Sequence, residues 1–553
     1  MSFGFIKIVL TAALVGATAS AWAAGRSEPA GGKAAAIPTA ATSTVYDRTV
    51  DPISAAIRQA LTNAGRAGGF LDKRDAAAVA EYYAEQGYAP SWTDNGLLTE
   101  RARQIILRLA AADSDGLDPR AYRTPPVGLG KYATASIPVL ANADVMLSQA
   151  IVTYARHAYA GRIDPSNLNK NIGYTPHLPN SVEVLADVAS AADPVAALAA
   201  YNPPQPEFQK LRDKLASLRD ATAKTFPDIP VGATLKPGMT DPRVVLIRER
   251  FELPTDVAAP DVYDDTVVAA VKAFQANANA KADGVIGKGT IAKLNQKPVD
   301  PVALIVANME RWRWMPRDMG KFYVRVNIPD FTLAVYQAGQ IVHSTRIVVG
   351  QVTKQTPIFS DEIENIVVNP TWNVPESIAA KEMIPQIQAD PTYFSRTNFQ
   401  VLANVGGRFR AVDPSMIDWS TVDVRKIQFK QPPGDGNALG HIKFNFPNQF
   451  AVYLHDTPSK SLFQRDYRAL SHGCMRVMDP MAFADVLFAH ENDGWSSARV
   501  KKLIGGPEQM IQLPVHIPVH ITYFTAWVDD DGTLETRNDI YGHDKLVEKL
   551  LGL

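Results

Sequence analysis

The residues of this chain best suited to covalent chemistry lie around its single cysteine. Cys474 is the only cysteine in 553 residues, and two histidines, His455 and His472, precede it. A cysteine attacks as the thiolate, and a neighbouring histidine can accept the proton that the thiol loses. Two interpretations are therefore open: Cys474 is a nucleophile, or it is an inert thiol that packs like a small apolar side chain.

The backbone around the cysteine favours the first interpretation. Gly473 allows N–H groups to converge, and one such group can stabilise the negative oxygen of a reacting carbonyl by ~2.7–4 kcal/mol. Asp479 and Pro480 predict a helix that begins just after this loop, because Asp is a good N-cap and Pro suits the first helical position. His455 follows an expected strand at 451–454, from which it could reach the loop.

Each histidine also has a second interpretation. His455 could be a satisfied histidine of the core, and His472 could serve only to shape the loop. On paper, His441, His455, His472 and Cys474 could bind a metal ion, but their spacing matches none of the common zinc patterns. We therefore expect no metal and no cofactor.

The N-terminus predicts export. Residues 1–23 contain an apolar run of signal length, Ile8 to Thr18, followed by Ala21-Trp22-Ala23, which suits signal cleavage. If the segment is not cleaved, it becomes a membrane anchor. Residues 24–50 are rich in small residues and predict a flexible linker. An unpaired cysteine cannot form an internal disulfide in an exported chain, which makes a chemical role for it more plausible.

The remaining chain predicts a multidomain α+β protein. A net charge of −1 gives no reason to expect nucleic acid as a partner. Residues 51–225 have helical periodicity and predict a helical domain, and 232–297 predict a small three-helix module. Residues 301–525 read as a mainly-β domain with an insertion at about 377–440 that we interpret as a lid, and 526–553 as a C-terminal tail.

The sequence around the cysteine, HDT…SHGCMRV, resembles the signature of the YkuD-type L,D-transpeptidases. VNIPDFTLAVY, VNPTWNVP and PPGDGNALGHIKF resemble the large periplasmic subgroup of that family. The helical region resembles its scaffold domain, and AVKAFQANANAKADGVIGKGTIAKLN resembles its peptidoglycan-binding-like module. The resemblance implies a multidomain enzyme of the periplasm whose catalytic domain is mainly β.

The resemblance also implies a role for each site residue. Cys474 would be the nucleophile and His455 the general base, oriented by the backbone carbonyl near Asp456. The other implied residues belong to the oxyanion loop (Gly473 and His472), brace that loop (Ser471 and Arg476), or line the donor site (Tyr453 and Trp372).

The implied reaction joins two peptidoglycan stem peptides. The thiolate attacks the L-centre carbonyl of diaminopimelate in a tetrapeptide donor, the terminal D-Ala leaves, and a diaminopimelate amine of a second stem accepts the acyl group in a 3→3 cross-link. With water as the acceptor, the protein would be an L,D-carboxypeptidase. With a protein lysine, it would anchor proteins to the wall. A non-catalytic wall-binding scaffold is the alternative of another class, and other cell-wall enzymes are conceivable partners.

Overall fold

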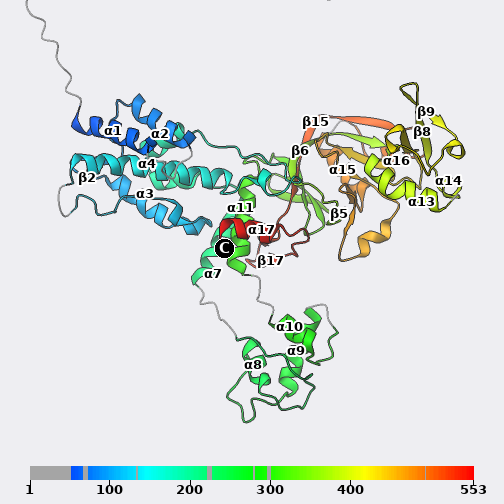
Figure 1. Ribbon diagram of the computed structural model, residues 1–553, viewed down its shortest axis with the longest axis horizontal. Coiled ribbons are helices and arrows are strands. Elements are labelled where there is room, and N and C mark those ends of the chain that lie inside the picture. The colour runs from blue at the N-terminus through cyan, green and yellow to red at the C-terminus, as the bar shows by residue number, and fades with distance from the viewer. Residues whose placement is uncertain are drawn as a thin grey trace, which may run out of the picture. The chain divides into compact units, whose positions relative to one another are not determined.

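The computed structural model describes residues 51–66, 73–131, 135–220, 227–277, 281–295, 300–390, 392–491 and 494–553. The expected signal sequence and linker, residues 1–50, lie outside them. The described residues form a multidomain α+β protein, as the sequence predicts: helical elements come first, and mainly β elements follow (Figure 1).

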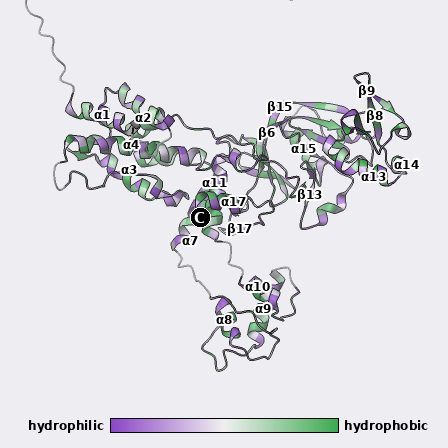
Figure 2. Cartoon of the chain, viewed as in Figure 1, coloured by the Kyte–Doolittle hydropathy of each residue, from purple (hydrophilic) through white to green (hydrophobic). Residues whose placement is uncertain are grey.

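The N-terminal region is a helical bundle around α4 (Ile137–Ala160). Its other elements are α1 (Pro52–Arg66), α2 (Lys73–Glu85), β1 (Thr93–Asp94), β2 (Leu97–Leu98), α3 (Glu100–Ala110), η1 (Ala112–Asp115), η2 (Pro119–Ala121), η3 (Pro165–Asn167), α5 (Ser181–Ser190) and α6 (Pro194–Ala199). Hydrophobic and hydrophilic residues alternate along these helices (Figure 2), so each can bury one stripe.

The buried polar groups of this bundle are satisfied internally. The carboxylate of Asp144, on α4, accepts hydrogen bonds from the backbone N–H groups of Ser91 and Trp92, both at 2.9 Å, and from the hydroxyl of Tyr83 at 2.6 Å. Helix α4 is also long and apolar enough to span a membrane by length and composition, but most of it is buried. It therefore has the character of a core helix.

One helix of the expected 51–225 domain packs elsewhere. The apolar stripe of α7 (Pro206–Asp220), formed by Phe208, Leu211 and Leu215, belongs to the hydrophobic core of the β domain. Helix α7 packs there against α11 (Pro301–Trp314). The sequence assigned this helix to the 51–225 helical domain from its periodicity, which shows that a helix has an apolar face but not what covers it; in the structure that face packs on the β domain.

The small module folds around its own core, as its motif predicts. It contains α8 (Arg243–Arg250), α9 (Asp265–Asn277) and α10 (Lys288–Leu294). The side-chain amide of Gln275 accepts a hydrogen bond from the N–H of Gly284 at 2.8 Å and donates one to the carbonyl of Val285 at 3.0 Å. Gly284 has a φ of +72°, which explains the glycine in the turn.

The β domain is one sheet that closes on itself. In strand order it runs β13-β5-β14-β12-β11-β6-β15-β3-β4, and β5 also pairs with β4. The strands are β3 (Phe322–Asn327), β4 (Thr332–Gln337), β5 (Gln340–Gly350), β6 (Phe359–Val368), β11 (Ile442–Asn445), β12 (Leu454–His455), β13 (Ala469–Ser471), β14 (Met475–Val477) and β15 (Gln509–Thr522). A tight turn at Ala338-Gly339, flanked by alternating apolar residues, joins β4 to β5 in a hairpin.

Short helices complete this domain. They are η7 (Lys460–Gln464), α15 (Pro480–Glu491) and α16 (Ser497–Lys501). Helix α15 begins where Asp479 and Pro480 predict, and the Asp479 carboxylate accepts the N–H of Ala482 at 3.1 Å. The cysteine therefore lies between β13 and β14, shortly before a helix.

The insertion is a subdomain with its own sheet and its own hydrophobic core. Its strands run in the order β7-β10-β8-β9. The elements are β7 (Trp372–Asn373), α12 (Glu376–Ile378), the π-helical turn η4 (Ala379–Met383), α13 (Ile384–Ala389), α14 (Tyr393–Arg396), β8 (Gln400–Val405), β9 (Arg408–Val412), η5 (Pro414–Met416), η6 (Val424–Lys426) and β10 (Ile427–Gln431).

The C-terminal residues are not a loose tail. They form β16 (Ala526–Val528), β17 (Leu534–Thr536) and α17 (His543–Leu551), and α17 lies beside α11 (Figure 1). Arg311 of α11 forms a buried ion pair with Asp544 of α17 at 2.6 Å, and Val547 and Leu551 join the core of the β domain. The expectation of a tail at 526–553 was wrong, since its apolar residues are covered only by contacts distant in sequence.

Candidate active site

Five side chains share one face of three neighbouring strands. Strand β12 lies between β11 and β14, with Lys443 paired to His455 and His455 paired to Arg476. Because side chains alternate along an extended chain, Tyr453 shares the face of His455, and Cys474 shares that of Arg476. We call this set the cysteine face: Lys443, Tyr453, His455, Cys474 and Arg476.

The opposite side of the same strands explains why this face is firmly set. Phe444, Leu454 and Met475 alternate with the residues of the cysteine face and are completely buried. A shift of one residue in any of these strands would bring a core side chain to the cysteine face. The hydrophobic core therefore fixes which side chains meet around the thiol.

His455 is held in one tautomer. Its Nδ1 lies 2.5 Å from the backbone carbonyl oxygen of Asp456, which can only accept, so Nδ1 carries the proton and Nε2 keeps its lone pair. Burial, together with the positive charges of Arg476 and Lys443, lowers the pKa of His455 to about 3. The ring is therefore neutral at physiological pH and able to accept a proton.

The Asp456 side chain has a separate task. Its carboxylate accepts hydrogen bonds from Lys460 Nζ at 2.6 Å and from the backbone N–H of His441 at 3.0 Å. It does not bond to the imidazole, which agrees with the expectation that the backbone carbonyl, not this side chain, orients His455.

Cys474 is partly exposed. Burial raises the pKa of its thiol, whereas the backbone N–H of Tyr453 and the positive charges of Lys443 and Arg476 act in the opposite direction. The thiol is therefore protonated at rest and needs a base. The described residues contain no hydrogen bond between this thiol and the ring of His455, and such catalytic bonds often tighten only when substrate binds.

The loop that carries the thiol is braced from three sides. Ser471 Oγ donates to the carbonyl oxygen of Cys474 at 2.5 Å and accepts the N–H of Gly473 at 3.2 Å. The carbonyl of Gly473, whose φ is +118°, accepts the hydroxyl of Thr356 at 2.7 Å. The hydroxyl of Tyr541 in turn donates to the carbonyl of Gly350 and accepts the N–H of Thr356.

His472 faces the insertion. Its Nε2 lies 2.7 Å from Oε1 of Glu382, in η4, and Glu382 also pairs with Lys354. Single π-helical turns are frequent at functional sites. These contacts connect the insertion to the loop beside the cysteine.

Two predicted site residues differ from their expected surroundings. The side chain of Arg476 forms no hydrogen bond or ion pair among the described residues, although we expected it to brace the loop, and its Nε is buried without a partner. Trp372 lies in β7, paired with Gln431 of the insertion sheet, and its ring lies 6.0 Å from that of Phe399. None of these contacts reaches the thiol.

Several residues of the site were missed from the sequence. Lys443 lies between the apolar residues Ile442 and Phe444, and this alternation could have placed it on the same face as His455. Thr356 belongs to a Thr-Pro pair that also resembles the family, but nothing in the sequence linked it to the loop. Glu382 and Tyr541 carried no signal, because they lie far from the cysteine in sequence and reach it only through the fold.

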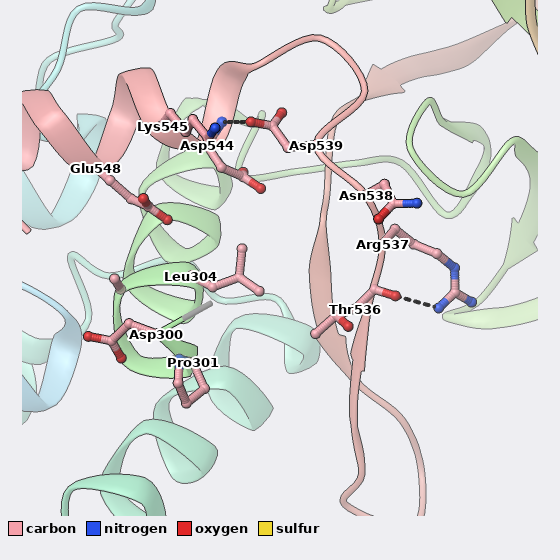
Figure 3. A pocket seen from close by; sticks show the side chains of 11 residues that line it. Asp300, Pro301, Leu304, Thr536, Arg537, Asn538, Asp539, Asp544, Lys545 and Glu548 are labelled. Atoms are coloured by element: carbon pink, nitrogen blue, oxygen red, sulfur yellow. Dashed lines mark hydrogen bonds between the residues drawn. The ribbon is translucent and has the colours of Figure 1, made fainter. Parts of the chain in front are cut away.

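Other candidate sites hold none of the predicted residues. A cavity of about 550 Å³ lies between the start of α11, β17 and α17. Figure 3 shows some of the side chains that line it, among them Asp300, Asp544 and Glu548. It contains no nucleophile, and Asp544 is already paired with Arg311. Within the described residues, no group of three or more His, Cys, Asp or Glu could hold a metal ion.

Three family models match separate parts of the chain. They are described as "Scaffold domain" for residues 77–215, "Putative peptidoglycan binding domain" for 248–294 and "L,D-transpeptidase catalytic domain" (YkuD) for 321–492. The last range contains the whole cysteine face.

A curated relative is similar to part of this chain. A protein of Haemophilus influenzae named "Putative L,D-transpeptidase" is 35% identical over 246 residues, which are 44% of this chain and 48% of the relative. The chain thus matches about half the length of that relative.

Two similar solved structures are L,D-transpeptidases. The one from Mycobacterium smegmatis is 12% identical with a TM-score of 0.19, and the match covers 36% of this chain and 58% of that one. The one from Xylanimonas cellulosilytica is 15% identical with a TM-score of 0.15, covering 54% and 100%. By its three family matches, the chain carries a YkuD L,D-transpeptidase catalytic domain together with a scaffold domain and a peptidoglycan-binding domain.

Proposed function

We propose that this protein is a peptidoglycan L,D-transpeptidase that forms 3→3 cross-links through a thioacyl intermediate on Cys474. The observation that carries the proposal is the cysteine face. It presents a partly exposed thiol on one strand and, on the adjacent strand, a neutral imidazole whose Nε2 is free to accept a proton. The match to a YkuD catalytic domain supports the same reaction class.

In the first step, Cys474 attacks the donor. His455 Nε2 takes the thiol proton as Sγ bonds to the L-centre carbonyl carbon of diaminopimelate in a tetrapeptide stem. The C–N bond to the terminal D-Ala then breaks, and the imidazolium returns its proton to the departing amine. The products are free D-Ala and a thioester on Cys474.

The negative oxygen of this step needs N–H donors. Among the described residues no acceptor takes the N–H of Cys474, and the N–H of Gly473 is held only by the 3.2 Å bond to Ser471. We assign these two groups to the oxyanion. His472, whose ring is bound to Glu382, contributes to the shape of the loop rather than a side-chain donor.

In the second step, a diaminopimelate amine from a neighbouring stem attacks the thioester. The new amide forms, the C–S bond breaks, and the proton released by the amine passes through His455 to the thiolate. We place the reaction in the periplasm, following the predicted export signal. Tyr453 and Trp372 are assigned to the donor site, and the small helical module to contact with the wall.

The test uses purified disaccharide-tetrapeptide and mass spectrometry of the products. We expect a cross-linked dimer, release of one D-Ala per cross-link and a thioacyl adduct on the protein. Cys474→Ala and His455→Gln should abolish all three while the far-ultraviolet circular dichroism stays unchanged. Trimmed tripeptide without dimer would identify a carboxypeptidase, and the absence of D-Ala release would leave only a non-catalytic role.

A further inference from the structure

Two cations of the cysteine face have no carboxylate within ion-pair distance among the described residues, although the charge of Glu508 acts on Lys443 from farther away. Lys443 and Arg476 extend from the strands on either side of His455. In the part of the chain that the structure describes, neither side chain forms a hydrogen bond or an ion pair, and the Nε of Arg476 is buried without a partner. The clearest contact of Lys443 is with the ring of Tyr453, whose centroid lies 4.0 Å from Nζ.

This arrangement is unfavourable without a ligand. An ammonium has three donors, and an aromatic ring offers it a weak electrostatic attraction and no oxygen acceptor. Burial lowers the pKa values of both Lys443 and Arg476, which shows that each charge is partly desolvated. A desolvated charge without a partner costs several kcal/mol, so such a pair is expected where an anion binds.

The thiolate of Cys474 accounts for only part of this charge. It carries one negative charge against the two positive charges of Lys443 and Arg476. The carboxylate of Glu508 acts on Lys443 from beyond ion-pair distance and leaves the hydrogen-bond donors of that ammonium unused. Both are positioned beside the bond that reacts, because Cys474 and Arg476 are two residues apart on the same face.

We propose that Lys443 and Arg476 form a subsite that binds a carboxylate of the donor stem peptide beside the scissile bond. The inference rests on the proposed function, and it adds the group that the donor must carry. Two of the carboxylates of the stem belong to the residues that this bond joins: the one on the terminal D-Ala and the one on the D-centre of diaminopimelate. Both present the same chemistry, a carboxylate that can accept hydrogen bonds from ammonium and guanidinium donors.

The experiment compares three tetrapeptide donors on the wild type, Lys443→Met and Lys443→Arg. One donor has both carboxylates free, one carries a C-terminal amide, and one carries an amidated diaminopimelate. Lys443→Met keeps the length of the side chain and removes its charge, and the exposed Lys501→Met serves as the control.

We expect Lys443→Met to raise KM for the free donor by about 10- to 100-fold, since a charge-assisted hydrogen bond contributes ~1.5–3 kcal/mol. The same substitution should barely affect the donor that lacks the bound carboxylate, which identifies the carboxylate. Lys443→Arg should restore most of the loss. An equal loss on all three donors would overturn the subsite, because Lys443 would then act only on the thiol.

Binding to the inactive Cys474→Ala protein separates the two proposals. We expect calorimetry to show that the double variant Cys474→Ala/Lys443→Met binds the tetrapeptide with free carboxylates more weakly than Cys474→Ala does, by a similar factor. If the single and the double variant bind this tetrapeptide with equal affinity, the subsite proposal is refuted, whether or not the wild type is an active enzyme. If the wild type binds the tetrapeptide through Lys443 but releases no D-Ala, the proposed function fails and the subsite stands.

Discussion

The hydroxyl of Tyr541 is expected to stabilise the loop that carries Cys474, although it lies near the end of the chain. It donates to the carbonyl of Gly350 at 2.5 Å and accepts the N–H of Thr356 at 3.2 Å. The hydroxyl of Thr356 then holds the carbonyl of Gly473 at 2.7 Å. Tyr541 is therefore connected to the residue beside the nucleophile through one intermediate side chain.

The substitution Tyr541→Phe leaves two buried backbone groups without a partner. Each orphaned group costs about 1–3 kcal/mol. Since the 3.2 Å bond is at the long end of the normal range, we expect the catalytic domain to lose roughly 2–4 kcal/mol of its free energy of opening. The ring itself, which stacks on Tyr523 at 5.6 Å, is retained, so no cavity is created.

Hydrogen exchange followed by mass spectrometry measures this loss within the catalytic domain, which matters because a multidomain chain does not unfold in one step. Peptides covering β5 and β15 should lose protection, and the rate at which the thiol is acylated should fall. Tyr201→Phe is the matched control: its hydroxyl bonds Asp187 at 3.2 Å at an exposed position, so it should cost less than about 0.5 kcal/mol. Equal protection in both variants would refute the reasoning.

Two further predictions concern pH and backbone geometry. Burial lowers the pKa of His520 to about 4, against 6.5 for a free histidine, so its stabilising contribution is complete above pH 6.5 and is lost as the unfolded chain takes up a proton at lower pH. His520→Gln should therefore flatten the fall in stability between about pH 6.5 and 4, measured by hydrogen exchange of peptides from β15, whereas exposed His516→Gln should not. Identical slopes would contradict the prediction. Gly473→Ala meets no atom closer than 3.7 Å, but its φ of +118° imposes strain of about 1–3 kcal/mol. We expect slower acylation of Cys474 with an intact fold, while Gly436→Ala, at an open position, should acylate at the normal rate.

The local pattern of the sequence predicted much of the fold. The strands on either side of Ala338-Gly339 form where period-two alternation places them, and α15 begins at the Asp479-Pro480 pair. The Gln275 motif produced the expected three-helix module. These features succeed because alternation, capping and tight turns depend on residues close together in the chain.

The sequence by itself determined that one thiol and one histidine follow the spacing of a known catalytic loop. Only the tertiary structure decided what surrounds them. Strand pairing brings Lys443 and Arg476 to either side of His455, and the C-terminal elements supply Tyr541 behind the loop. Such contacts join residues far apart in sequence. A local pattern shows that an element has an apolar face, but packing of the whole core decides which other element covers that face.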